Sequence, residues 1–481
     1  MSAEEKKKDF RLLHVAVYLM IVGLFFFVIP PIAPITKPGM CLLGVFFAAI
    51  FGWSITPDIW PSLLTFVLLP FTGLVNLTGV LSLTWGTDTF LMIILMMTFV
   101  AYLETSGTTS YVASFLMSRK MLVGHPWRFI FMLFLIAYLI SSFCGNFPGM
   151  LITWSFVYSI SRELEYKPYD KFPSLLIFGI AVMGALSLSA VPWANNALVI
   201  LNSYAASSGT AINYGHYLAY SVPYGIFSIL AFMAICKFIF RLDVSKLKNF
   251  EPGFIDKKDL QLTAERKIAL CSLAAVIIMY LVPSLLPTTN VIRVVSDQMG
   301  LGLKLVLLFM ILGLIRVDHK PICNFPKLAS RGVPWGMLMM CVGIFSFVGL
   351  LGSKDAGISA YLAQTLTPVF QNGGVVFLFF ITVVVTLVLT NFMINMVVAV
   401  IMISAVVPIA ASLGINSLQI VYLITIVCTI AFALPAASAA SCVLFANTEW
   451  VRPKDVYKYC IPTIIALALV AVIWNVILFM F

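Results

Sequence analysis

Charged side chains are scarce in this 481-residue chain: only 10% of its residues are Asp, Glu, Lys or Arg, and 62% are apolar. A soluble globular domain carries about 25% charged residues, so we expect lipid rather than water to solvate most of this chain. The scarcity argues against a soluble enzyme and a disordered scaffold. The net charge of +10 does not indicate a nucleic-acid partner, since membrane topology accounts for it.

The chain also lacks the clusters that catalysis and metal binding require. Its nine cysteines form no Cys-x-x-Cys pair and mostly fall in apolar runs, as small core residues do. The apolar runs contain no carboxylate pair and no Ser-His arrangement, which disfavours a membrane-embedded transferase. No ring of charges marks a channel pore. We predict that the chain is not an enzyme and needs no organic cofactor.

Long apolar runs are abundant. A membrane-spanning helix needs about 20 mostly apolar residues, and eleven runs approach or reach that length. Two further blocks, about 128–160 and 375–411, are longer and carry polar breaks at 143–149 and 390–395. Each is predicted to be a re-entrant helical hairpin whose turn is buried or lines a cavity, with two ordinary spans as the alternative. The eleven runs are 12–32, 39–53, 60–77, 88–104, 172–190 with 196–206, 217–240, 268–286, 301–316, 335–351, 417–434 with 440–448, and 459–480.

The distribution of basic residues supports the hairpin interpretation. If the N-terminus is cytoplasmic and both blocks are hairpins, 25 of the 29 Lys and Arg residues fall on the cytoplasmic side. Such a bias is typical of multi-pass proteins. We therefore predict a multi-pass protein of the cytoplasmic membrane with its N-terminus inside.

An internal repeat relates the two halves. The broken blocks align at an offset of 249 residues, and two short motifs, 104–107 and 354–357, lie 250 residues apart. A span broken by helix-unfriendly residues follows each hairpin, within about 172–206 and 417–448. The predicted organisation is a tail with the first span (1–38), a first repeat (39–240), a cytoplasmic linker (241–267) and a second repeat (268–481).

An odd number of crossings per repeat places the second copy upside down in the membrane. Inverted repeats with discontinuous helices at matching positions are typical of secondary transporters, with binding sites where the breaks meet. Broken helices expose N–H groups that favour an anion and carbonyls that coordinate a cation. The pattern thus predicts an all-α polytopic transporter with about eleven spans and two hairpins in inverted repeats.

The sequence resembles the divalent anion/sodium symporter family of dicarboxylate, citrate and sulfate carriers. The resemblance rests on the order of hairpin and broken helix, on Glu104-Thr105-Ser106-Gly107, and on the segment 434–445. It implies a homodimer in the lipid bilayer, an elevator movement of the transport region, a small organic anion as substrate and sodium as coupling ion.

The hairpin tips depart from the family's Ser-Asn-Thr signature. They read Gly145-Asn146-Phe147 and Ile394-Asn395-Met396, so each asparagine persists while the hydroxyls are replaced. A di- or tricarboxylate substrate with sodium coupling is expected, and a sodium-independent exchanger or a proton-coupled carrier is the alternative. The oxygen-bearing candidates for sodium coordination are Ser141, Gly145, Asn146 and Ala194 in the first repeat, and Thr390, Ile394, Asn395 and Ala437 in the second.

Candidates for substrate binding are the polar side chains at the same breaks. They have the amide and hydroxyl groups that would hold an anion where no Arg or Lys is present. Capping of the half-helices is the structural alternative for each. The predicted set is Ser142, Asn146, Asn196, Asn391, Asn395 and Ser441.

Overall fold

The computed structural model describes residues 3–480 except 57, 119–123, 145, 211, 250–259, 287–288, 318, 334, 352, 359, 362–363, 365–373, 413 and 435–436. Within these residues the chain is almost entirely helical. The described strands are two residues long each and form one antiparallel hairpin, in which Arg316 pairs with Pro321 and Val317 with Lys320.

The helices of the first half begin at capping residues. Thr36 and Thr87 accept the backbone N–H groups of Gly39 and Phe90, which satisfies donors that have no partner within the helix. The elements are α1 (Ala3–Gly23), η1 (Leu24–Val28), α2 (Lys37–Ile55), α3 (Trp60–Leu68), η2 (Leu69–Thr72), α4 (Leu77–Leu83), α5 (Asp88–Thr105), α6 (Thr108–Met117), α7 (Pro126–Cys144), α8 (Asn146–Glu163), α9 (Lys171–Leu186), η4 (Ser187–Ser189), α10 (Asn195–Ser208), α11 (Tyr214–Ala234) and η5 (Ile235–Ile239).

The second half of the chain shows the same kind of capping. Thr263 accepts the N–H of Arg266 at the start of α12, and Ser438 accepts that of Ser441 at the start of α20. The elements are η6 (Ser245–Asn249), α12 (Ala264–Leu285), α13 (Val291–Leu314), β1 (Arg316–Val317), β2 (Lys320–Pro321), α14 (Phe325–Gly332), α15 (Trp335–Leu351), α17 (Gly374–Thr390), α18 (Asn395–Ser412), α19 (Ser417–Val427), α20 (Ala439–Ala446) and α21 (Pro453–Met480).

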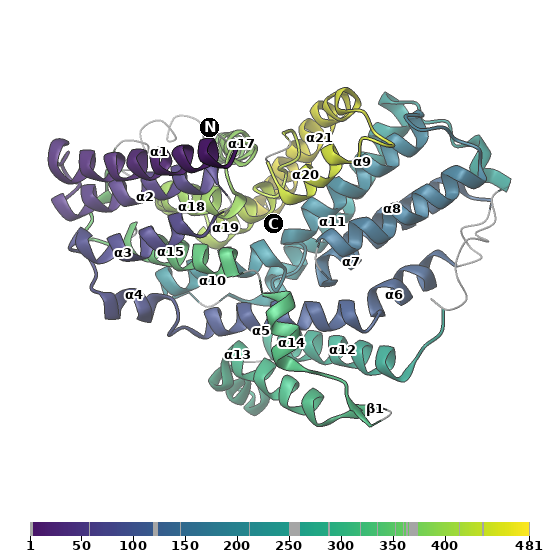
Figure 1. The fold of residues 1–481 in the computed structure, drawn as a ribbon, viewed down its shortest axis with the longest axis horizontal. Coiled ribbons are helices and arrows are strands. Elements are labelled where there is room, and N and C mark those ends of the chain that lie inside the picture. The colour runs from purple at the N-terminus through teal and green to yellow at the C-terminus, as the bar shows by residue number, and fades with distance from the viewer. Residues whose placement is uncertain are drawn as a thin grey trace.

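The helices gather in three regions (Figure 1). At one end α1, α2 and α3 pack in sequence, and α15 from the second half packs on α2 and α3. At the other end α7, α8 and α9 contact one another, with α20 against α9 and α21 against α11. Helix α5 connects these regions and also packs on α13 and α14. Segments from both halves of the chain therefore build each region.

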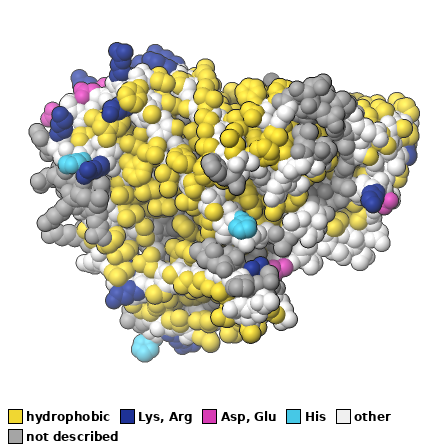
Figure 2. Space-filling model, turned by 180° about the vertical axis from the view of Figure 1, so that it is seen from behind, with side chains coloured by type: hydrophobic (Ala, Val, Ile, Leu, Met, Phe, Trp, Pro, Cys, Tyr) yellow, Lys and Arg dark blue, Asp and Glu magenta, His cyan; other side chains and the backbone are white. Residues whose placement is uncertain are grey.

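The surface is apolar over wide areas. Figure 2 shows hydrophobic side chains spread over one face, with Lys and Arg mostly toward its edges. Large apolar side chains are strongly exposed at many helix positions, for example Phe27 at 85%, Leu314 at 77% and Met480 at 74%. Exposed apolar surface of this extent needs a lipid environment.

Each predicted span contains a helix, but length alone identifies fewer crossings. Four helical segments among the described residues are long and apolar enough to cross a membrane: 126–143, 171–189, 214–239 and 453–480. A fifth arises if Phe90–Thr105 and Thr108–Leu116, which bend by 63°, form one span. Shorter apolar helices cover parts of several other predicted runs, for example 12–28, 37–53 and 302–314. The count of eleven spans therefore stays a prediction.

Two bends were not predicted. Gly107 has a φ of +68° between α5 and α6, a left-handed conformation that glycine adopts at no steric cost. Gly300, with a φ of +64°, interrupts α13, and the Asp88 carboxylate accepts the N–H of Gly302 just beyond it at 2.9 Å. Asp88 thus caps the second part of α13 and joins it to the start of α5.

Candidate functional site

The first predicted hairpin is formed by α7 and α8, which pack against each other along their length. Only residue 145 lies between them, and this sodium candidate, Gly145, is outside the described residues. A Cβ at Gly149 would overlap the side-chain oxygen of Ser141, so the glycine lets the two helices meet closely. The Ser141 hydroxyl lies 3.5 Å from the carbonyl oxygen of Asn146, its acceptor.

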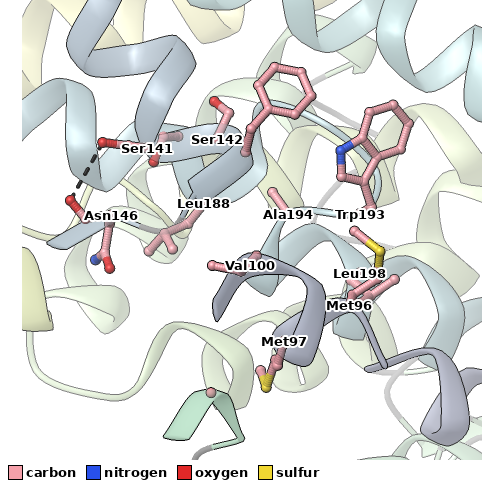
Figure 3. Close-up of a pocket in the computed structure, with 13 residues that line it drawn as sticks. Met96, Met97, Val100, Ser141, Ser142, Asn146, Leu188, Trp193, Ala194 and Leu198 are labelled. Atoms are coloured by element: carbon pink, nitrogen blue, oxygen red, sulfur yellow. Dashed lines mark hydrogen bonds between the residues drawn. The ribbon is translucent and has the colours of Figure 1, made fainter. Parts of the chain in front are cut away.

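The hairpin tip opens onto a cavity of about 160 Å³. Four predicted residues, Ser141, Ser142, Asn146 and Ala194, line it together. Figure 3 shows the two serines and Asn146 on one side, and Met96, Met97 and Val100 of α5 on the other. The lining residues are Met96, Met97, Val100, Ser141, Ser142, Phe143, Asn146, Ser187, Leu188, Trp193, Ala194, Leu198 and Gly332.

The cavity is neutral, with a polar side and an apolar side. Asp, Glu, Lys and Arg are absent from its described lining residues, and the described residues hold no cluster of His, Cys, Asp or Glu that suits a transition metal. The polar groups are hydroxyls, a carboxamide and backbone carbonyls, which are ligands that a hard monovalent cation accepts. Ser142 donates to the carbonyl of Tyr138 at 2.6 Å, so its oxygen keeps its acceptor capacity for a ligand.

Asn196 belongs to the same break but does not line this cavity. It lies near the start of α10, it is 5% exposed, and its side-chain Nδ2 has no hydrogen-bond partner among the described residues. An unpaired buried donor of this kind is costly unless a ligand or water accepts from it. Asn196 therefore remains a candidate for substrate binding, because its buried Nδ2 has no hydrogen-bond partner among the described residues.

The second hairpin, formed by α17 and α18, is organised differently. The Thr390 hydroxyl lies 3.0 Å from Oδ1 of Asn395 and also contacts the carbonyl oxygen of Cys428. Asn391 donates to the carbonyls of Leu387 (2.8 Å) and Ile430 (3.2 Å). Its Oδ1 accepts the N–H of Ala433 at 2.9 Å. Protein groups therefore satisfy much of the polar capacity of this tip.

The remaining predicted residues of the second repeat also bond within the protein. Ser441 donates to the carbonyl of Leu434 at 2.6 Å, across the break. Its backbone N–H donates to the side chain of Ser438, which is the residue that caps α20. The carbonyl of Ile394 accepts the N–H groups of Val397 and Val398. Ala437 is buried at 4% exposure and donates its N–H to the carbonyl of Leu434.

The two broken helices pack against each other, and each half of one contacts a half of the other. Helix α10 packs on α19, and α20 packs on α9, so each half-helix meets a half-helix of the other repeat. At the crossing the hydroxyls of Ser189 and Thr429 are 3.2 Å apart. Tyr217 and Ser221 of α11 donate to the carbonyls of Ser189 and Ala190. The first break is therefore held by the helix that follows it.

Sequence reasoning missed the wall of the cavity that α5 and α14 provide. Met96, Met97 and Val100 are apolar residues in an apolar helix, so their sequence carries no sign of a role. Gly332 at the end of α14 approaches the same helix: a Cβ there would lie 2.6 Å from the Cβ of Ala101. Only the packing of α14 on α5 reveals this contact.

Comparisons with known proteins agree with this architecture. Residues 46–428 match the family model described as citrate transporter. An uncharacterized transporter of Methanocaldococcus jannaschii is 22% identical over 330 residues, which is 68% of each chain. The inorganic phosphate transporter PHO87 of Saccharomyces cerevisiae is 24% identical over 176 residues, covering 36% of this chain and 18% of the yeast protein.

The fold also has a counterpart among solved structures. The crystal structure of the YdaH transporter of Alcanivorax borkumensis superimposes with a TM-score of 0.58, covering 92% of this chain and 99% of that one. The sequence identity is 14%, so this likeness concerns the fold alone.

Proposed function

Because the chain belongs to the citrate transporter family, and is therefore a multi-pass membrane transporter rather than an enzyme, we propose that it carries a small organic anion across the cytoplasmic membrane. A di- or tricarboxylate is the substrate and sodium is the coupling ion, with no other cofactor. The observation that carries the proposal is the cavity at the first hairpin tip, where Ser141, Ser142, Asn146 and Ala194 converge.

The chemistry of this cavity suits a cation beside an anion. Oxygen atoms of Ser141, Asn146 and Ala194 would contribute to the coordination of sodium. The neutral donors nearby would hold a carboxylate without an Arg clamp, which favours release of the cargo. Asn196, whose Nδ2 is buried and unpaired among the described residues, is proposed to donate to the substrate.

The two hairpin tips are proposed to have unequal roles. The second tip contains Thr390, Asn391 and Asn395. The side chains of Thr390 and Asn391 hydrogen-bond to backbone carbonyls and to a backbone N–H of the segment after α19. An ion there would have to displace these hydrogen bonds. We therefore propose that the coupling ion binds at the first tip. The second tip has a structural role and attaches its hairpin to the broken helix.

The inverted repeat is proposed to supply alternating access. Support comes from two reciprocal contacts. Thr36, which caps α2, donates to the carbonyl of Asp355 at 2.6 Å, and the guanidinium of Arg266, near the start of α12, lies beside Gly107. Each repeat thus places its first helix against the motif at 104–107 or 354–357 of the other repeat. Gly107 and Gly357 also share positive φ values of +68° and +70°.

In the proposed mechanism, the hairpins and broken helices move as an elevator against the remaining helices in a homodimer, with the N-terminus in the cytoplasm. The cavity at the first tip lies between the moving hairpin and the remaining helices, because α5, one of the remaining helices, forms its apolar wall. A displacement of the hairpin along α5 would therefore uncover the cavity. Cross-linking of Cys pairs placed on α5 and α7 tests this movement.

The function is tested by uptake of radiolabelled citrate, succinate, malate and inorganic phosphate into proteoliposomes, with and without an inward sodium gradient. Phosphate is included because the matched yeast relative is an inorganic phosphate transporter. We expect sodium-stimulated carboxylate uptake that Asn146→Ala abolishes. Asn76→Ala, which removes only an exposed helix cap, is the control and should transport normally.

Three results would change the proposal. Uptake without a sodium effect, but with counterflow into preloaded vesicles, would indicate an exchanger. Uptake driven by a pH gradient would indicate a proton-coupled carrier. Transport of phosphate with none of the carboxylates would contradict the carboxylate assignment.

A further inference from the structure

The cavity at the first hairpin tip has few hydrogen-bond donors left for a ligand. Three serines are among its described lining residues. Ser142 and Ser187 each donate to a backbone carbonyl of their own segment, at 2.6 and 2.7 Å. A hydroxyl has a single proton, so these two serines can accept from a ligand but cannot donate to it. The hydroxyl of Ser141, the third serine, has a longer contact of 3.5 Å with the carbonyl of Asn146.

The main donor that remains on the polar side is the carboxamide of Asn146. This residue is half-buried at the start of α8. Its side-chain nitrogen carries two N–H groups, and both start from the same atom, so they serve a single carboxylate. A sodium ion bound beside it would add one positive charge. The polar side therefore has partners for one ionised carboxylate.

The opposite side of the cavity is apolar. Met96 and Val100 are four residues apart on α5 and share a face of this helix. Figure 3 shows them across the cavity from the serines. The rings of Phe143 and Trp193 also line it, with centroids 6.2 Å apart. The indole nitrogen of Trp193 is buried, so a ligand in the cavity meets the carbon atoms of the ring.

The described lining residues include no Asp, Glu, Lys, Arg or His that could serve a second charge on a ligand. The nearest ionisable carboxyl along α5 is Glu104, one turn beyond Val100. On α14, Arg331 precedes the lining residue Gly332. Glu104 and Arg331 interact electrostatically with each other, so together they add no net charge to this side.

A second ionised carboxylate on the cargo would thus face the apolar side without a partner. A carboxylate in apolar surroundings takes up a proton instead of staying ionised. We propose that the cavity binds a dicarboxylate as its monoanion, with the ionised carboxylate at Asn146 and the second carboxyl group, protonated and neutral, against Met96 and Val100. The inference rests on the proposed function for the position of the cargo. It narrows the cargo to species with a single negative charge and makes Met96 and Val100 specificity-determining residues.

The test is isothermal titration of succinate and of monomethyl succinate into the full-length protein in phosphatidylcholine nanodiscs at a fixed sodium concentration. Monomethyl succinate keeps one carboxylate and has a neutral ester in place of the other. At pH 8, where succinate is mainly the dianion, we expect monomethyl succinate to bind at least about tenfold more tightly. Equal affinities, or tighter binding of succinate, would refute the inference, because the second carboxylate would then have a partner or remain in water.

The pH dependence separates protonation of the cargo from protonation of the protein. Above the pH at which succinate loses its second proton, each unit decrease in pH raises the share of the monoanion about tenfold. The affinity for total succinate should therefore rise about tenfold from pH 8 to pH 7, whereas the affinity for monomethyl succinate should stay constant. A parallel change for both ligands would indicate a titrating protein group and would overturn the assignment to the cargo.

Two variants of Val100 have side chains of similar length and differ in charge. Val100→Lys places an ammonium group at the apolar side, and Val100→Met places an uncharged chain there. We expect Val100→Lys to reverse the preference at pH 8 in favour of succinate, and Val100→Met to retain the preference for monomethyl succinate. A retained preference in folded Val100→Lys would contradict the role of the apolar side. If Val100→Lys does not fold, the comparison of the two ligands in the unaltered chain still decides the question.

Variants of two asparagines locate the binding. Asn146→Ala should abolish binding of monomethyl succinate, and Asn76→Ala, which removes only an exposed helix cap, should leave it unchanged. Binding that survives Asn146→Ala would overturn the assignment to this cavity.

Failure of the inference is distinguishable from failure of the proposed function. Sodium-stimulated uptake of dicarboxylates, together with equal binding of the two ligands, would refute the monoanion and leave the proposed function standing. The expected binding preference without uptake of any carboxylate would refute the proposed function and leave the binding site standing. Absence of binding for both ligands would refute the inference.

Discussion

The hydroxyl oxygens of Ser189 and Thr429 lie 3.2 Å apart, although 240 residues separate them in the chain. Each residue follows the first half of a broken helix. Each hydroxyl also lies within hydrogen-bond distance of a carbonyl in its own last turn, that of Leu186 at 3.2 Å and that of Ile426 at 2.7 Å. A hydroxyl that donates to its own helix has no proton left for the other. The two breaks therefore meet through a weak contact.

A double-mutant cycle should measure this weakness. We expect Ser189→Ala and Thr429→Val to show a coupling free energy below about 1 kcal/mol, since the net value of a neutral hydrogen bond is about that size. The measurement is reversible unfolding in mixed micelles of the intact protein, both single variants and the double variant. A coupling of several kcal/mol would mean that the pair is a strong link between the repeats.

The asparagines of the two hairpin tips should differ in their effect on stability. Asn391→Ala leaves the N–H of Ala433 and the carbonyl of Ile430 without their partner, and each unmade buried bond costs about 1–3 kcal/mol. We expect a lower thermal unfolding midpoint together with lost uptake. Within the described residues the carboxamide of Asn146 makes no such bonds, so Asn146→Ala should lose uptake at an almost unchanged midpoint. Equal midpoints for the two variants would contradict the unequal roles of the tips.

Much of the fold was predictable because apolar periodicity and length determine where helices can cross lipid. The predicted break at 143–149 contains the observed end of α7 and start of α8. Gly107 lies in the polar motif that follows the predicted span 88–104, but its left-handed conformation and the 63° bend between α5 and α6 were not predicted. The shared motif at 104–107 and 354–357 was found in the sequence, whereas its contacts with Arg266 and Thr36 depend on packing.

Part of the candidate site was also predictable from the sequence. Polar residues at the breaks stand out in an apolar sequence, and three of them, Ser141, Ser142 and Asn146, line one cavity. At the second tip the polar side chains hydrogen-bond to backbone carbonyls, such as those of Cys428 and Ile430. Because every residue has a carbonyl, the sequence does not indicate these partners. The sequence therefore does not distinguish an asparagine that binds a ligand from one that binds the backbone, and the difference between Asn146 and Asn391 emerged only from the structure.

Close packing at the first tip gives a further prediction. Gly149→Ala places a methyl group against Ser141, and overpacking of this kind costs about 1–3 kcal/mol. We expect a lower unfolding midpoint and reduced uptake, because the displaced Ser141 lines the cavity. Gly313→Ala is the control: nothing lies within 4 Å of a Cβ there, so the midpoint should stay the same or rise slightly. Normal uptake by Gly149→Ala would show that the tip tolerates separation of α7 and α8.

The placement of the coupling ion is tested by removing one hydroxyl from each tip. Ser141→Ala deletes an oxygen that lines the cavity and whose one hydrogen bond within the described residues is the 3.5 Å contact with the carbonyl of Asn146. We expect it to raise the sodium concentration for half-maximal uptake about tenfold, the effect of about 1.4 kcal/mol, at an almost unchanged unfolding midpoint.

The matched variant in the second tip is Thr390→Val, which keeps the shape of the side chain. Its hydroxyl contacts Asn395 and the carbonyl of Cys428, so its loss should lower the unfolding midpoint and leave the sodium dependence of the remaining uptake unchanged. The measurement is uptake as a function of sodium concentration at fixed substrate. If Thr390→Val shifts the sodium dependence as strongly as Ser141→Ala does, both tips hold an ion, and the hydrogen bonds of the second tip must open when sodium binds.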